Sequence, residues 1–262
     1  QYKYNKRARQ PTKNKFIMAS VATKEGKYRI VTRNEWLEKR LELLAEEKRV
    51  AKEISKLNEI RRSLPMHECE DYILVGKNGN ARLSDLFEGE KTQLVVYHMM
   101  MADGAESGCS LCSFFIDHFL ASLPHLQQRV SFAIVAKNDY SKMMKWVTEK
   151  KANWDENCFY SSKESSFSEN FQVAFTKEQM ESKNTVYNYI RTWNFGSTAP
   201  GISVFYKKVN EDGTFKIYHT YDTYSAGLGN LVSGLTLLDL TPEGRNEKTN
   251  RNMYWVKHKE SY

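Results

Sequence analysis

The longest periodic pattern in the chain lies near its start. Between residues 34 and 62, apolar residues recur three and four positions apart, and charged residues fill most of the remaining positions. This spacing predicts an amphipathic helix. Thr32 and Glu35 fit a capping box at its start, and Pro65 is expected to stop it. We interpret it as a packing or pairing helix, and its mixed charge leaves open whether it joins two chains into a homodimer.

Two nearly continuous apolar runs come later, at residues 94–100 and 130–136. Such runs are typical of strands that are buried on both faces of a sheet. Helical patterns follow them over residues 109–123 and 141–151, and Pro124 is expected to end the first of these helices. The resulting β-α-β-α order predicts an α/β fold with a mixed central sheet flanked by helices.

Strand patterns flank this core on both sides. Residues 72–75 and 81–86 predict a hairpin followed by a short helical turn. Residues 202–207 and 215–221 enclose an Asn-Glu-Asp-Gly turn and predict an antiparallel hairpin.

The segments around the second hairpin are less regular. Residues 153–198 are polar and aromatic, and they are too long for an ordinary connection. We expect an insertion with a surface helix near residues 177–183. Residues 228–240 form a final helical or mixed apolar segment, and the charged tail after Thr241 is expected to be loose.

Charge is concentrated at the start of the chain. The formal net charge is +7, but six Lys and Arg residues lie among the first 17 residues, which contain no acid, so the remainder carries +1. A basic footprint for nucleic acid is therefore not indicated. We expect residues 1–31 to form a basic, disordered extension in which Met18 fits a natural start; an organellar presequence is the alternative.

The length of the apolar runs also indicates where the protein is located in the cell. None approaches the ~20 residues that a membrane-spanning helix needs. We expect a soluble cytoplasmic protein, with an organellar matrix as the alternative.

The stretch Cys-Ser-Leu-Cys, with thiols at Cys109 and Cys112, carries the most specific chemistry. Two thiols on the first turn of a helix can close a disulfide and reopen it with little backbone movement. The helix N-terminus favours a thiolate on Cys109, which makes it the expected nucleophile, and Cys112 would resolve the mixed disulfide. Because the pair follows a buried strand in βαβ order, it predicts a thioredoxin-like dithiol.

Two other interpretations of the pair stay open at this point. A structural zinc site would need two more ligands, but Cys69 and Cys158 stand alone in the sequence. Alternatively, the two cysteines are simply buried helix residues.

Further residues are candidates for supporting roles. Pro200 precedes a strand, where thioredoxin-like proteins set a cis-proline that faces the dithiol; a strand-edge proline is the alternative. His98 ends the strand before the dithiol, and is either a proton acceptor near the thiols or a core histidine. Asp103 and Glu106 either tune the thiolate or are solvated.

A second aromatic and polar cluster lies in the last predicted strand. It resembles a binding face, although aromatic residues on a strand usually serve packing, and it comprises Tyr218, His219, Tyr221 and Tyr224.

Several motifs in order resemble the family catalogued as domain of unknown function 899 (DUF899), whose members are labelled predicted dithiol-disulfide oxidoreductases. The similarity runs from residue 34 to about residue 247. Its pieces are E-W-L-E-K-R-L-E-L-L-A-E-E-K (35–48), D-L-F-E-G (85–89), L-V-V-Y-H-M-M-M (94–101), G-C-S-L-C-S-F-F (108–115), A-P-G-I-S-V-F-Y (199–206), and Y-H-T-Y-D-T-Y-S-A-G-L with D-L-T-P-E-G-R (218–245).

This resemblance implies a thioredoxin-like fold and places the family's two cysteines on Cys109 and Cys112. Family members commonly have proline after the first cysteine, where this chain has Ser110. The Thr-x-x-Cys pattern of peroxiredoxins is absent, because Glu106 and Cys109 stand three positions before the two cysteines.

The sequence therefore predicts four parts: the extension (1–31), the helix (32–66), a thioredoxin-like domain with an insertion before its C-terminal hairpin (67–247), and a tail (248–262). We expect a thiol-disulfide oxidoreductase that needs no bound cofactor and acts with a disulfide substrate and a cellular thiol reductant. The alternative is a catalytically silent binding or scaffold protein of the same fold.

Overall fold

The computed structural model describes residues 28–149, 154–191, 193–247 and 253–262. The chain divides into two compact units, Gln1–Ile60 and Arg61–Tyr262. Most of the expected basic extension, up to residue 27, lies outside the described residues. Within the part of the chain that is described, no helix has the length and apolar composition that crossing a bilayer would require.

The predicted long helix is α1 (Arg33–Arg62). Its capping box forms as expected: the Thr32 amide donates to Glu35 Oε2 at 3.0 Å, and the Glu35 amide donates to Thr32 Oγ1 at 3.4 Å. The helix ends three residues before Pro65, which cannot supply the amide hydrogen that a helix interior needs.

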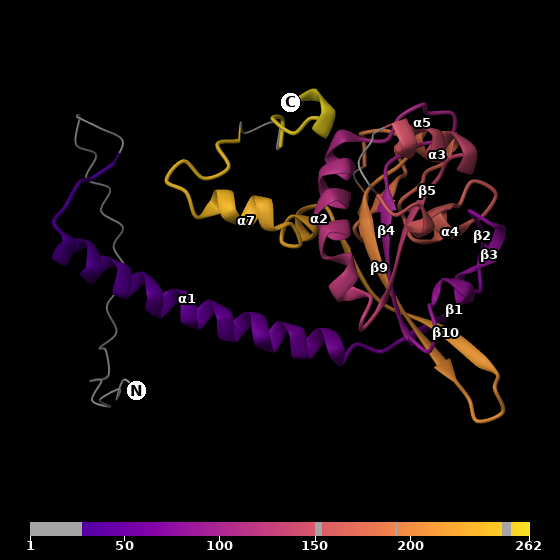
Figure 1. Cartoon of the computed structure of the whole chain (residues 1–262), viewed down its shortest axis with the longest axis horizontal. Helices are drawn as coiled ribbons and strands as arrows, with labels where there is room; N and C mark the ends of the chain where they lie inside the picture. The colour runs from indigo at the N-terminus through magenta and orange to yellow at the C-terminus, as the bar shows by residue number, and fades with distance from the viewer. Residues whose placement is uncertain (1–27, 150–153, 192, 248–252) are drawn as a thin grey trace. The chain divides into compact units, whose positions relative to one another are not determined.

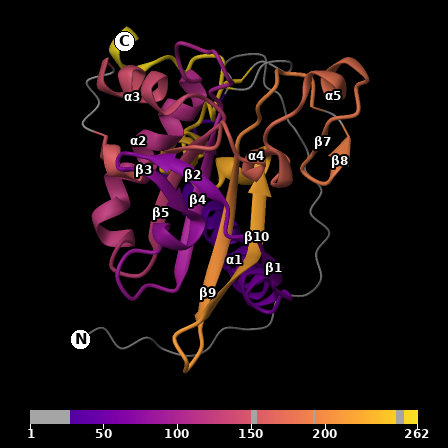
Figure 2. The ribbon, with the colours of Figure 1, turned by 90° about the vertical axis from the view of Figure 1, so that its right-hand side faces the viewer.

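An eight-stranded mixed sheet forms the centre of the second unit, in the order β1-β10-β9-β4-β5-β6-β2-β3. Its strands, shown in Figures 1 and 2, are β1 (His67–Cys69), β2 (Ile73–Gly76), β3 (Gly79–Arg82), β4 (Gln93–Met99), β5 (Ser131–Ala136), β6 (Phe159–Ser161), β9 (Gly201–Val209) and β10 (Phe215–Tyr224). A separate small ribbon joins β7 (Val186–Tyr187) to β8 (Ile190–Arg191).

The helical elements of this unit connect and cover the strands. They are the α-helices α2 (Ser110–Leu126), α3 (Tyr140–Glu149), α4 (Phe167–Asn170), α5 (Lys177–Glu181), α6 (Ala226–Gly229) and α7 (Ser233–Asp239), and the 3-10 turns η1 (Leu83–Leu86), η2 (Glu156–Cys158) and η3 (Lys259–Ser261).

The connections around β4 are those of a thioredoxin-like fold. Strand β4 runs parallel to β5, and β5 runs parallel to β6, with α2 and α3 as the crossovers. On its other side β4 pairs antiparallel with β9, which forms a hairpin with β10. Parallel strands need such helical crossovers, and both crossovers lie on one face because the chain steps in one direction across the sheet.

Each face of the sheet has its own apolar core. One core contains Tyr97 and Met99 from β4 and is covered by α2, α3 and α7. The other contains Leu94 and Val96 from the same strand and is covered by η1 and by α4 from the insertion. Side chains alternate along β4, so its apolar run supplies both cores, as predicted for a strand buried on both faces.

Three expectations differ from the structure. Pro124 does not end α2, which continues to Leu126 and closes with a hydrogen bond from the Gln127 amide to the Leu123 carbonyl at 2.9 Å. Pro124 lies in the last turn of α2 and cannot donate to the carbonyl four residues before it, and the helix ends only two residues later. Residues 67–69, for which the sequence patterns predicted no strand, pair with β10 as strand β1. In the tail, Val256 is buried and Trp255 packs against Phe114, so the described residues 253–262 are not loose.

Candidate dithiol site

Cys109 and Cys112 lie at the start of α2, after the loop that follows β4. Cys109 is the N-cap residue of α2, with an extended backbone, and its amide donates to the Met100 carbonyl at 3.1 Å. Cys112 sits one turn into the helix and is buried; its Sγ accepts a hydrogen bond from the Met100 amide at 3.3 Å. Both cysteines are free thiols, and both are hydrogen-bonded to Met100, the residue that follows β4.

The two thiols differ in acidity. The pKa of Cys109 falls to about 6, mainly because the Cys112 thiol donates a hydrogen bond to its sulfur, with support from the Leu111 and Cys112 amides; burial opposes this shift. The pKa of Cys112 is raised well above its usual range, first because its proton is used in that hydrogen bond and then by burial. Near neutral pH the pair therefore holds one thiolate, on Cys109, and one thiol.

Tyr97 is the side chain of β4 that faces the dithiol. It is completely buried in the same core as Cys112, and its hydroxyl contacts the Cys112 thiol. Burial, together with the two nearby sulfurs, raises the pKa of Tyr97, so it stays protonated. We interpreted residues 94–100 as one apolar run and did not predict Tyr97 as a site residue. Alternation along a strand does put Tyr97 and Met99 on one face and His98 on the other.

His98 lies on the opposite face of the sheet from Cys112. Its ring packs against Phe167 and Phe171, and its Nε2 is 2.8 Å from Ser203 Oγ. Burial lowers the pKa of His98 to about 4, so it is neutral. The structure thus gives His98 no contact with the thiols, and it corresponds to the alternative, a core histidine.

Pro200 directly precedes β9, whose first residue, Gly201, pairs with His98. The expectation of a cis-proline is wrong, because every peptide bond within the described residues is trans. The Pro200 carbonyl accepts a hydrogen bond from the Tyr187 hydroxyl at 2.7 Å. Burial is the main cause that raises the pKa of Tyr187 to about 12. The Cys112 sulfur makes a smaller contribution to the same rise.

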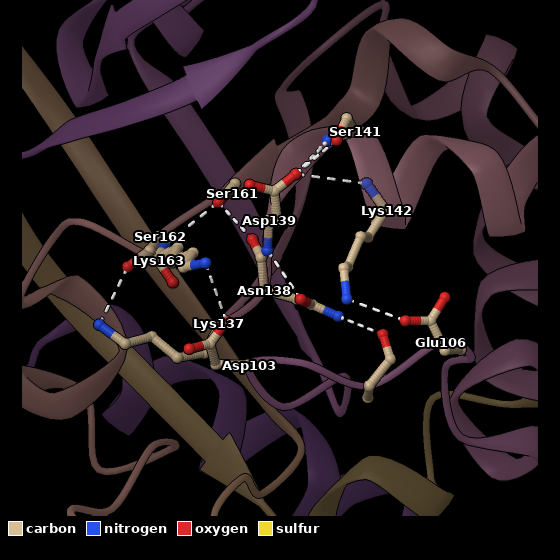
Figure 3. A network of polar contacts seen from close by, with 11 residues as sticks. Asp103, Glu106, Lys137, Asn138, Asp139, Ser141, Lys142, Ser161, Ser162 and Lys163 are labelled. Carbon is tan, nitrogen blue, oxygen red and sulfur yellow. Dashed lines mark hydrogen bonds and ion pairs between the residues drawn. The ribbon is translucent and has the colours of Figure 1, made fainter.

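The loop before the dithiol is held by a polar network (Figure 3). Buried Asn138 donates from its side-chain amide to the Ala105 carbonyl at 2.8 Å. Two ion pairs reach the same loop: Lys142 Nζ lies 2.8 Å from Glu106 Oε1, and Lys163 Nζ lies 3.1 Å from Asp103 Oδ1. The two acidic residues of the loop therefore anchor it to the segments that follow β5 and β6.

The end of the chain reaches the first turn of α2. His258 Nδ1 is 3.3 Å from Ser113 Oγ, which also donates to the Cys109 carbonyl at 3.2 Å. The ring of His258 packs edge-on against Trp146, whose six-membered ring occupies the space beside Gly108. Sequence patterns gave no signal for this contact, because it joins residues 145 positions apart.

The remaining cysteines lie elsewhere. Cys69 is in β1, and Cys158 is buried at the end of η2. Burial is the main cause that raises the pKa of each thiol to about 12. Within the described ranges, no group of three or more His, Cys, Asp or Glu side chains is placed to share a metal ion.

Solved structures with some similarity to the chain include peroxiredoxins and a Sco-family protein. A cysteine-to-serine mutant of Xanthomonas campestris peroxiredoxin Q is 12% identical, with a TM-score of 0.38, over 63% of this chain and 90% of that protein. Yeast mitochondrial 1-Cys peroxiredoxin is 15% identical, with a TM-score of 0.35, over 72% and 84%. A Sco-family cytochrome c oxidase assembly protein is 12% identical, with a TM-score of 0.32, over 67% and 95%.

A family model identifies the family to which the chain belongs. No curated protein matches the chain. A family model described as bacterial protein of unknown function (DUF899) matches residues 25–262, which agrees with the motifs found in the sequence. Because this match extends over nearly the whole sequence and includes both cysteines, the chain belongs to the DUF899 family.

Proposed function

We propose that the protein is a thiol-disulfide oxidoreductase in which Cys109 is the nucleophile and Cys112 the resolving thiol. The observation that supports this most directly is the asymmetry of the pair, with a pKa of about 6 on the half-buried Cys109 and a raised pKa on the buried Cys112. An attacking thiolate and a protonated resolving thiol are what exchange with a disulfide needs.

The proposed reaction proceeds in two exchanges. The Cys109 thiolate attacks one sulfur of a substrate disulfide; the substrate S–S bond breaks, a mixed disulfide forms, and one substrate thiolate leaves. Cys112 then loses its proton to the departing substrate sulfur and attacks Cys109, which releases the second substrate thiol. The substrate gains two electrons, and the protein holds a Cys109–Cys112 disulfide.

A cellular thiol reductant would restore the dithiol, with no bound cofactor taking part. Such a cycle fits a compartment that keeps most thiols reduced, and we propose the cytoplasm or an organellar matrix. Tyr97 would position Cys112, because its hydroxyl lies beside that sulfur in the same core.

A redox titration tests the proposal. The purified protein is equilibrated with glutathione buffers of defined potential, free thiols are labelled, and the pairing of Cys109 with Cys112 is read by mass spectrometry. We expect a reversible two-electron transition that Cys109→Ser abolishes. Cys69→Ser is the matched control and should leave the transition unchanged, because Cys69 lies in β1 and not beside the dithiol at the start of α2.

Trapping of the mixed disulfide distinguishes the nucleophilic cysteine from the resolving cysteine. With Cys112→Ser, a disulfide substrate such as oxidised glutathione should remain attached to Cys109, since no resolving thiol is present. Failure of the two wild-type thiols to pair at any potential, or their labelling only after denaturation, would contradict the proposal. The catalytically silent binding protein would then be the better description.

A further inference from the structure

A second site lies on the face of the sheet opposite α2, near the edge formed by β1 and β10. Two adjoining cavities of about 550 and 500 Å³ open there. Their shared walls are His67, Tyr189, His219, Asp222 and Tyr224. The cluster that the sequence marked as either a binding face or packing thus contributes to a hollow surface.

A β-bulge creates this site. In a regular strand, residues three positions apart point to opposite faces. The register of β10 against β9 shifts between His219 and Tyr221, which inserts one extra residue. As a result, His219 Nε2 and Asp222 Oδ1 lie 2.9 Å apart on the same face.

Asp222 is unusual because it is buried with few donors. Its side chain is 6% exposed. Oδ1 lies 2.9 Å from His219 Nε2, but among the described residues neither of these two atoms has a hydrogen-bond partner. Oδ2 receives one long hydrogen bond, of 3.5 Å, from the Tyr189 hydroxyl. Gln172 Oε1, in the smaller cavity, is also buried and has no partner among the described residues. Asp222 Oδ1 and Gln172 Oε1 are therefore two buried acceptors that receive no hydrogen bond from the described residues.

The rest of the lining includes several aromatic rings and acidic side chains, together with His67 and small polar residues. The rings of Tyr189 and Tyr224 meet edge to face, with centroids 5.8 Å apart, and Phe171 packs against His219 at 5.1 Å. Glu70 lines the smaller cavity. The Arg61 guanidinium already stacks over Tyr221, at the wall of the larger cavity.

We propose that this hollow binds a small organic cation, whose amine or guanidinium N–H groups donate to Asp222 and Gln172 and whose carbon chain packs against the tyrosine rings. A desolvated carboxylate makes strong charge-assisted hydrogen bonds, and aromatic faces attract cations. A metal ion fits less well, because the described residues provide no group of three or more His, Cys, Asp or Glu side chains for one. The inference is independent of the dithiol, which lies on the other face.

Calorimetric titration of the full chain at neutral pH tests this with four probes of similar size: n-butylammonium, n-butylguanidinium, n-butanol and n-butyrate. We expect at least one of the two cations to bind and the other two probes not to bind. Asp222→Asn should weaken cation binding by about 10-fold or more, as expected for loss of a charge-assisted hydrogen bond. Glu211→Gln, on the exposed turn between β9 and β10, is the matched control and should bind as the wild type does.

Two further variants keep the test decisive. Tyr189→Leu alters a 67% exposed side chain, so it should fold normally and still weaken cation binding at least about threefold. Replacing both Cys109 and Cys112 with Ser should leave cation binding unchanged. The proposal is overturned if no cation binds, if butanol or butyrate binds as well as the cations do, or if Tyr189→Leu and a folded Asp222→Asn both bind like the wild type.

Discussion

Cys109 and Cys112 share one helical turn, yet the structure gives them opposite acidities. Cys109 caps the helix and receives a hydrogen bond, whereas Cys112 is fully enclosed and donates it. The sequence predicted Cys109 at the start of a helix, and a cysteine at a helix N-terminus is favoured as a thiolate. The larger cause, the mutual hydrogen bond, depends on how the two side chains are packed.

This difference predicts a pH profile for alkylation of the reduced protein by iodoacetamide. The rate at Cys109 should rise as pH increases through about 6 and then level off, because the thiolate is the reactive form. In Cys112→Ala the midpoint should move to higher pH, since the main cause of the lowered pKa is removed. Cys69→Ala is the control and should keep the midpoint. A wild-type midpoint near 8.5, the ordinary cysteine value, would contradict the structure.

His98 makes a separate prediction about stability. Its pKa is about 4 when folded and ~6.5 when unfolded, so between these values the unfolded chain binds more protons. The free energy of unfolding should therefore fall as pH drops from ~6.5 to about 4, by roughly 3 kcal/mol from this group.

Urea unfolding of His98→Gln checks this and should lose that part of the pH dependence. Exposed His125→Gln is the control and should keep it. Alkylation of Cys109 should be the same in both variants, because His98 faces the other core. A changed alkylation rate in His98→Gln alone would restore the role of proton acceptor.

At the scale of elements, local patterns predicted most of the second unit. The strands around β4 and the hairpin β9–β10 occur where alternation and turn residues indicated, and the turn closes with a hydrogen bond from the Gly213 amide to the Asn210 carbonyl at 3.0 Å. Strand β1 was missed because three residues carry too little periodicity to be recognised. Its pairing with β10 is a long-range contact.

The loop before the dithiol is an element whose shape depends on Asn138. We expect Asn138→Ala to lower the free energy of unfolding by about 1–3 kcal/mol, because the part-buried Ala105 carbonyl loses the donor that the buried Asn138 side chain supplies. Amide hydrogens of residues 102–108 should also exchange faster with solvent. Exposed Asn80→Ala is the control and should change neither measurement. Unchanged exchange in Asn138→Ala would show that the two ion pairs alone hold the loop.

At the scale of the whole molecule, the sheet of the second unit separates two cores, and the insertion completes one of them. We predicted residues 153–198 as an irregular insertion with a surface helix, and α5 (Lys177–Glu181) is that helix, with no buried residue. The bounds of the insertion were wrong, because residues 159–161 form β6 and pair with β5 in the central sheet. The same insertion also supplies Phe167, which is fully buried among Phe171, Phe205 and His98. The insertion is therefore a structural layer as well as a surface feature.

Phe167→Ala tests this layer. We expect a loss of about 3–5 kcal/mol in the free energy of unfolding, as for other large core truncations, measured by urea denaturation. Phe195→Ala, in the same insertion, removes a ring that is 79% exposed and should change stability by less than about 0.5 kcal/mol. Similar small losses in both variants would mean that the insertion does not hold this face of the sheet.

The sequence by itself determined the elements and the position of the dithiol, because apolar periodicity, capping residues and the spacing of Cys109 and Cys112 act over a few residues. It also identified the family, through motifs in a fixed order. Only the tertiary structure decided which face each side chain occupies: it placed Tyr97 beside Cys112, His98 in the other core, and His219 next to Asp222 across a bulge. Such contacts depend on strand register and on residues far apart in the chain, and a one-residue shift of register moves a side chain to the other face of the sheet.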